Sequence, residues 1–117
     1  MSVTFRPAGA RDPNAPACNV ANGNVRPMCA AVGLDPGEYL TGEIDASEIP
    51  GVLAECEIAM SNCAEALDRR APMLRDRVQR GRWIQHCSDD ASACARLARL
   101  EAVLVYAEAR GLGVAWS

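Results

Sequence analysis

The sequence predicts an α+β fold in which residues 1–117 form a single compact domain, because one core suffices at this length. Half of the residues are apolar but only 4% are aromatic, and the abundance of alanine favours closely packed helices. Alternating apolar and polar residues at 2–6 favour a short strand, and the ending at residues 112–117 is interpreted as another. We expect two principal helices and one or two short helices, packed on a small three-stranded sheet formed by residues 2–6, 83–87 and 113–116.

The N-terminal region is predicted to contain a strand, a loop and a short helix. Residues 2–6 alternate in polarity and stop at Pro7, as is typical of a strand. Residues 7–24 are rich in Pro, Ala, Gly and Asn, so we expect a loop there. A short helix is predicted to begin at Asn24 as its N-cap and to stop at Gly33.

The second helix is predicted from a cap pattern and a helical apolar stripe. Residues 38–44 are expected to form an extended connector leading into it. Asp45, followed three residues later by Glu48, matches a capping box. The residues at helical spacing that predict its buried face are Ile49, Val52, Cys56, Met60, Cys63 and Leu67. Pro72 is expected to break the helix, and residues 73–79 to form a separate short one.

The C-terminal region is predicted to contain a strand and the strongest helix of the chain. Residues 83–87 are β-prone and too few for a helix, so they predict the second strand of the sheet. Ser88 is expected to cap the helix that follows, and Gly111 to end it. Asp89 and Asp90 would then lie at the positive end of the helix dipole. Its predicted buried stripe comprises Cys94, Leu97, Leu100, Leu104 and Ala107. A second, smooth surface comprises Ala91, Ala95, Ala98, Ala102 and Ala109.

The six cysteines are interpreted from the absence of an export or membrane signal. A cytoplasmic chain keeps its thiols reduced, so we expect mainly reduced core cysteines, with a disulfide framework and a metal site as alternatives. Cys56 and Cys63 lie on one helix about 10.5 Å apart, which is too far for a disulfide between them. A metal site would use Cys94, His86 or Cys87, and one of Cys56 or Cys63. We predict no metal and no cofactor.

Catalytic chemistry has little support in this sequence. His86 is the only histidine, and its neighbour Cys87 would point to the opposite face of a strand. Cys94 could reach His86 from the next helix, but no pattern of orienting residues or oxyanion loop accompanies the pair. Motifs of phosphate-binding loops, dinucleotide-binding folds, serine hydrolases and zinc proteases are absent from the sequence. We therefore predict that the protein is not an enzyme.

Charge is sorted sharply along the chain. Residues 27–68 contain nine acids and no base, whereas residues 69–82 contain six arginines and one acid. The two segments either neutralise each other or meet a partner of opposite charge. The predicted acidic partner-binding surface comprises Glu38, Glu43, Glu48, Glu55, Glu57 and Glu65. An alternative anion-binding site comprises Arg69, Arg70, Arg75, Arg77, Arg80 and Arg82.

These observations favour a small cytoplasmic module for protein–protein interaction, such as a phage or bacterial inhibitor or accessory protein that presents the acidic surface to a basic partner. A net charge of −3 argues against a general nucleic-acid binder. The alternatives are binding of nucleic acid or another anionic ligand through the arginine cluster, and a zinc or thiol protein. We expect no membrane association, and a homo-oligomer is compatible with these observations.

Five short elements carry a resemblance to other proteins, and they are residues 19–24, 32–34, 42–44, 81–84 and 114–117. Through these elements, which span most of the chain, the sequence resembles small uncharacterised proteins of GC-rich bacteria and their phages. Those proteins have no assigned activity, so the resemblance implies no site residues. It favours a small accessory or mobile-element protein.

Overall fold

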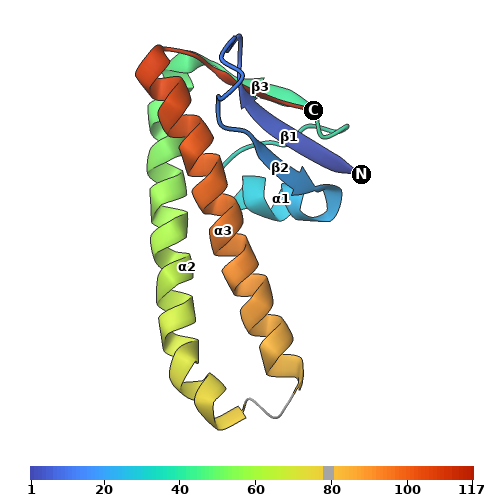
Figure 1. Cartoon of the computed structure of the whole chain (residues 1–117), viewed down its shortest axis with the longest axis vertical. Helices are drawn as coiled ribbons and strands as arrows, with labels where there is room; N and C mark the ends of the chain where they lie inside the picture. Colours follow the sequence, from blue (N-terminus) through green and yellow to red (C-terminus); the bar gives the residue numbers. More distant parts are fainter. Residues whose placement is uncertain (78–80) are drawn as a thin grey trace.

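The structure is a computed structural model that describes the backbone of residues 1–77 and 81–117 and the side chains of residues 1–65 and 91–117. A long helical hairpin stands beside a small antiparallel sheet and a shorter helix (Figure 1). The predicted α+β class with two principal helices is therefore confirmed. Among the described residues the sheet has four strands, one more than expected.

The sheet joins the two ends of the chain. Its strands are β1 (Ser2–Pro7), β2 (Cys18–Ala21), β3 (Gly42–Ile44) and β4 (Val114–Trp116). Their order is β2-β1-β4-β3, and all neighbours are antiparallel. The predicted strands at both chain ends are confirmed, and they pair with Phe5 opposite Trp116. The rings of these two residues stack with their centroids 5.2 Å apart.

Two strands lie where the sequence predicts none. β2 falls inside residues 7–24, which were predicted to be a loop, and β3 falls inside the connector over residues 38–44. Both strands occupy the edges of the sheet and have three or four residues each. Segments this short have weak intrinsic preference, so pairing with β1 and β4 decides their conformation.

The helical elements are α1 (Asn22–Ala31), the 3₁₀ turn η1 (Ala46–Glu48), α2 (Ile49–Arg77) and α3 (Gly81–Arg110). α3 contacts α2 and also contacts β1, β2 and β4, so it lies between the other long helix and the sheet (Figure 1). None of the helices in the described part of the chain is long and apolar enough to cross a membrane.

Residues 83–87 are helical and lie inside α3, so the predicted second strand is wrong. Tertiary pairing with α2 overrides the weak β preference of five residues. Ser88 consequently lies inside α3 and is not its N-cap, and Asp89 and Asp90 are not at a helix start. The predicted break at Pro72 is also wrong, because α2 continues to Arg77. Proline has a helical φ angle but removes one backbone hydrogen bond, and the packing of α2 along α3 offsets this cost.

The predicted helix starts are wrong in detail because the side chains make other contacts. α1 begins at Asn22, so Asn24 lies within the helix and caps nothing. The Asp45 carboxylate accepts a hydrogen bond from the Ser47 hydroxyl at 2.8 Å rather than capping backbone amides. Short polar side chains at helix starts often bond locally in this way. A 3₁₀ turn therefore comes between Asp45 and α2.

The predicted helix ends at Gly33 and Gly111 are confirmed. Gly33 and Gly111 adopt positive φ angles of 71° and 65°, a conformation that favours glycine. After α1, the Leu34 amide donates to the Cys29 carbonyl at 2.8 Å, and the Gly33 amide donates to that of Ala30 at 3.3 Å. This is the Schellman pattern, and it turns the chain so that Leu34 packs against the core.

The core lies between α3, the sheet and the inward faces of α1 and α2. The predicted buried stripe of α3 is confirmed, because its members Leu97, Leu100, Leu104 and Ala107 are buried and Cys94 is half-buried. On α2, Ile49 and Cys56 are fully buried, and Val52, Met60 and Cys63 are half-buried, whereas Leu67 lies outside the described side chains. The alanines of the second predicted surface are all exposed: Ala91, Ala95, Ala98, Ala102 and Ala109.

Candidate functional site: the acidic surface and the α1–α2 groove

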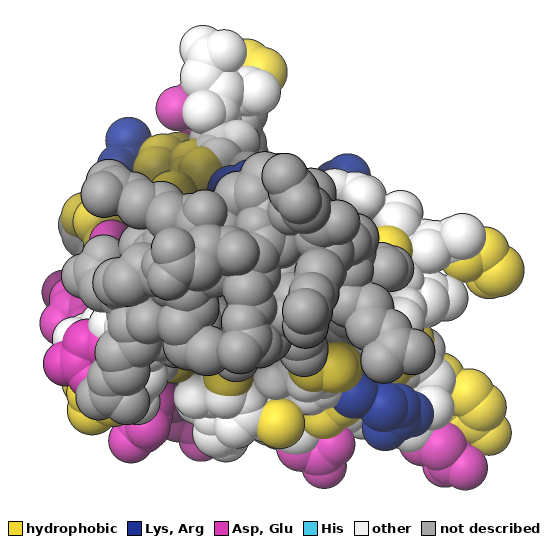
Figure 2. Space-filling view, turned by 90° about the horizontal axis from the view of Figure 1, so that it is seen from below, with side chains coloured by type: hydrophobic (Ala, Val, Ile, Leu, Met, Phe, Trp, Pro, Cys, Tyr) yellow, Lys and Arg dark blue, Asp and Glu magenta, His cyan; other side chains and the backbone are white. Residues whose placement is uncertain are grey.

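The predicted acidic surface is distributed over four parts of the fold. Glu38 lies in the loop after α1, Glu43 in β3 and Glu48 at the end of η1, and α2 carries Glu55, Glu57 and Glu65. All six side chains are exposed. In an end-on view, acidic side chains gather along the left and lower edges of the molecule, around the residues drawn in grey (Figure 2).

Two of the six glutamates, Glu48 and Glu55, meet at an open groove between the C-terminal end of α1 and the start of α2. We call this the α1–α2 groove, and its volume is about 610 Å³. It is lined by Val32, Gly33, Leu34, Ser47, Glu48, Gly51, Val52 and Glu55. The Schellman turn supplies one wall, and η1 with the first turns of α2 supplies the other.

The floor of the groove is apolar and its rim is negative. Val32 is buried, and Leu34 and Val52 are half-buried against the core. Glu48 ends η1 and Glu55 lies on α2, seven residues further along the chain, and both side chains are exposed where they line the groove. The lining contains no basic residue. The groove therefore presents apolar surface between two exposed negative charges.

Gly51 lines the groove and adds no side chain to it. It lies on α2 between the two glutamates, and a Cβ built there would have no atom within 4 Å. A glycine inside a helix lowers helix stability relative to alanine, so its presence is informative. Here a larger residue would project into the groove without meeting the rest of the protein.

The other glutamates point elsewhere. Glu57 follows Glu55 by two residues, which on a helix turns it by about 200°, to the opposite flank of α2. Glu43 lies opposite Ala115 in the sheet, within β3. The structure thus brings Glu48 and Glu55 together, and it leaves Glu38, Glu43 and Glu57 on separate parts of the surface.

The alternative anion-binding residues lie outside the described side chains. This holds for Arg69, Arg70, Arg75, Arg77, Arg80 and Arg82, and also for Asp68. Neutralisation between the acidic and basic segments and anion binding by the arginines therefore stay predictions. His86 and Cys87 also lie outside the described side chains.

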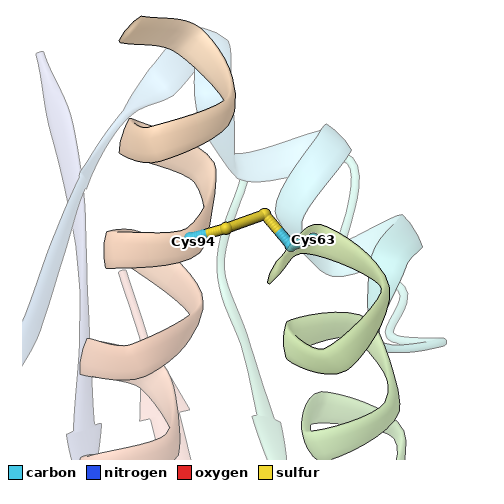
Figure 3. The surroundings of a disulfide bond; sticks show 2 residues. All are labelled: Cys63 and Cys94. Carbon is cyan, nitrogen blue, oxygen red and sulfur yellow. A yellow bond between two sulfur atoms is a disulfide. The ribbon is translucent and has the colours of Figure 1, made fainter. Parts of the chain in front are cut away.

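The cysteine prediction needs a correction, because Cys63 and Cys94 form a disulfide between α2 and α3 (Figure 3). Their Cα atoms are 5.9 Å apart, in the usual range for a disulfide. Antiparallel pairing of the two helices places these positions opposite each other, and this register is not encoded in local spacing. The expectation of mainly reduced thiols is therefore wrong for this pair.

The remaining described cysteines, Cys18, Cys29 and Cys56, are buried and free. Burial raises the pKa of Cys56 to about 11, with smaller contributions from Glu101 and Glu57. Burial likewise raises the pKa of Cys29 to about 11, and it raises that of Cys18. A thiol with such a pKa is a poor nucleophile and a poor metal ligand at neutral pH.

The predicted metal set does not assemble from its described members. Cys63 and Cys94 are bonded to each other, and the Cys56 thiol donates to the Leu97 carbonyl at 3.5 Å. Among the described residues no group of three or more His, Cys, Asp and Glu side chains is placed to hold a metal ion. These cysteines contribute to the core and to one covalent link between helices.

Sequence reasoning missed the groove and the disulfide. The isolated Gly51 within a helical stretch is the local signal that could have indicated the groove. The pairing of Cys63 with Cys94 leaves no such signal, because it depends on how two helices align.

Comparisons with protein-family models, with curated proteins and with solved structures found no match for this chain. Its function is therefore inferred from the chemistry of its surface.

Proposed function

We propose that this protein is a protein-interaction module that binds a basic partner through its acidic surface. The observation that carries this proposal is the exposure of all six predicted glutamates within a segment, residues 27–68, that contains nine acids and no base. Exposed charges of one sign steer an oppositely charged partner and select against partners of like charge.

Two exposed apolar side chains within this segment support the proposal. Tyr39 is 82% exposed and Ile58 is 56% exposed, although both are large. Tyr39 follows Glu38, and Ile58 lies one helical turn after Glu55. Protein interfaces combine apolar or aromatic anchors with a charged rim, so this mixture suits protein binding better than binding of a small ion.

The loop that carries Tyr39 is held in place by the fold. The Trp116 indole donates to the Pro36 carbonyl at 3.0 Å, and the Arg26 guanidinium donates to the Glu38 carbonyl at 3.4 Å. A contact residue on a loop that hydrogen bonds already fix in place loses little conformational entropy when it binds. This arrangement supports Tyr39 as a contact for the partner.

The proposal includes a non-enzymatic role, as an inhibitor or accessory protein, in the cytoplasm. Cytoplasmic reductants keep most thiols reduced, so the Cys63–Cys94 bond would there become two thiols. Trapping thiols in intact cells with an alkylating agent tests the compartment. Labelling of both Cys63 and Cys94 indicates a reducing compartment, whereas an intact bond between them contradicts the cytoplasmic assignment.

The test of binding is capture of the partner from host extract, identification by mass spectrometry, and titration with purified components at two salt concentrations. Reversal of Glu55 and Glu57 to arginine should weaken binding by about tenfold or more and reduce its salt dependence. Glu108→Arg reverses one exposed acid on α3 and is the control for the single variants Glu55→Arg and Glu57→Arg, because each of the three changes the net charge by the same amount. Circular dichroism checks folding.

Unchanged affinity of the double variant at low salt would contradict the proposal. Capture of an oligonucleotide, lost when Arg69, Arg70 and Arg75 are neutralised, would instead support the alternative function of anion binding.

A further inference from the structure

We infer that the α1–α2 groove is the docking site for a peptide segment of the partner in which a lysine or arginine stands beside a large apolar residue. This inference rests on the proposed function and locates it. The three features that select such a segment are the apolar floor, the paired carboxylates and the size of the groove.

The apolar floor selects an apolar side chain. Leu34 and Val52 are each packed against the core on one side and remain partly exposed on the other. Covering the remaining apolar surface removes it from water, which is the main source of affinity in protein association. A purely polar ion gains nothing from this floor.

The paired carboxylates select a cation. Glu48 and Glu55 are exposed at the same groove, and no base lies among the lining residues to neutralise them. Arginine and lysine lay their aliphatic stems along apolar surface while the charged group reaches solvent-exposed acids. One basic side chain can therefore lie along Leu34 or Val52 and reach a glutamate.

The size of the groove favours a peptide segment over a small ion. Its volume of about 610 Å³ is in the range of sites that hold several side chains. The groove is open to solvent, so a segment of the partner can enter it directly. A second copy of this chain could supply a basic segment too, and the test separates this occupant.

Gly51 permits a variant that fills the groove and keeps every charge. Gly51→Gln places a side chain where nothing lies within 4 Å, so the fold has no contact to lose. Ala54→Gln is the matched control, because Ala54 is exposed on the same helix but outside the groove. Both variants add a neutral side chain of similar size to α2.

The experiment is a fluorescence-anisotropy titration of a labelled peptide of alternating arginine and leucine against the parent and both variants. The expected result is that Gly51→Gln weakens binding by about tenfold or more, as for a central contact of an interface, whereas Ala54→Gln stays within about twofold of the parent. The matching peptide of alternating glutamate and leucine should not bind. Thermal melting of Gly51→Gln should match or exceed that of the parent.

Each other outcome has a defined meaning. If Gly51→Gln binds as tightly as the parent while reversal of Glu55 and Glu57 abolishes binding, the groove is not the site, but the acidic surface stands. If the parent does not bind the arginine–leucine peptide, the groove is not such a site, whereas the proposed basic partner is tested separately by capture from host extract. If sedimentation shows a dimer of the parent that Gly51→Gln dissociates, the groove is occupied by a second copy instead.

Discussion

Replacing both members of the disulfide, Cys63→Ser with Cys94→Ser, should lower the stability of the protein substantially. The bond joins residues separated by 31 positions. For a loop of this length, the chain-entropy relation gives a stabilisation of about 3.7 kcal/mol through restriction of the unfolded chain. Because a small domain is stable by only about 5–15 kcal/mol, this is a large share. Both cysteines are half-buried, so the serine hydroxyls can remain solvated.

The assay is urea unfolding of the parent and the double variant, each with and without a dithiol reductant. With typical urea slopes of about 1–3 kcal/mol/M for small proteins, the loss corresponds to a midpoint lower by roughly 1–4 M. The reduced parent should approach the double variant, and the reductant should not affect the double variant.

The result that would refute this reasoning is a parent whose midpoint is the same with and without reductant. Titration of free thiols tests directly whether the disulfide forms. The unfolded, unreduced parent should titrate fewer thiols than the six cysteines of the sequence, and a count of six would show that the bond does not form.

Three further predictions concern the core. Leu104 is fully buried, so Leu104→Ala should cost about 2–5 kcal/mol in urea unfolding, and a loss below about 1 kcal/mol would contradict its placement. A Cβ on Gly42 would lie 2.5 Å from the Trp116 ring, so Gly42→Ala should destabilise by about 1–3 kcal/mol, measured by thermal melting. The pKa values of Cys29 and Cys56 are raised from 9.0 to about 11, so the folded protein favours the protonated thiols. The stability that these protonated thiols contribute is complete below pH 9 and is lost as pH rises through about 11. Iodoacetamide should therefore label neither thiol of the native protein at pH 8, as read by mass spectrometry, but both after unfolding.

Several features were predicted correctly because their signals are local. The alternation in residues 2–6 predicts one strand and the short apolar ending at residues 113–116 predicts another, and both are present. The glycine ends at Gly33 and Gly111 follow from the positive φ angle that a Schellman turn requires. The buried stripe on α3, exemplified by Leu104, follows from helical periodicity alone. The exposure of the predicted glutamates likewise follows from their positions outside such stripes.

The candidate site was predicted only in part. Glu48 and Glu55 were among the acidic residues selected from the sequence, but nothing local indicated that these two share a groove with Leu34. That juxtaposition requires the turn after α1 to lie against the start of α2. Gly51 lines the same groove, and the role of its missing side chain can be judged only once its surroundings are known.

The sequence by itself determined the α+β class, the inward faces of the long helices, the glycine ends of α1 and α3, and the separation of acidic from basic segments. The tertiary structure alone decided that residues 83–87 are helical, that β2 and β3 are strands, and that Cys63 meets Cys94. The physical reason is the range of the interactions involved. Backbone preference and periodicity act over a few residues, whereas the alignment of two helices and the pairing of short strands depend on partners distant in the chain.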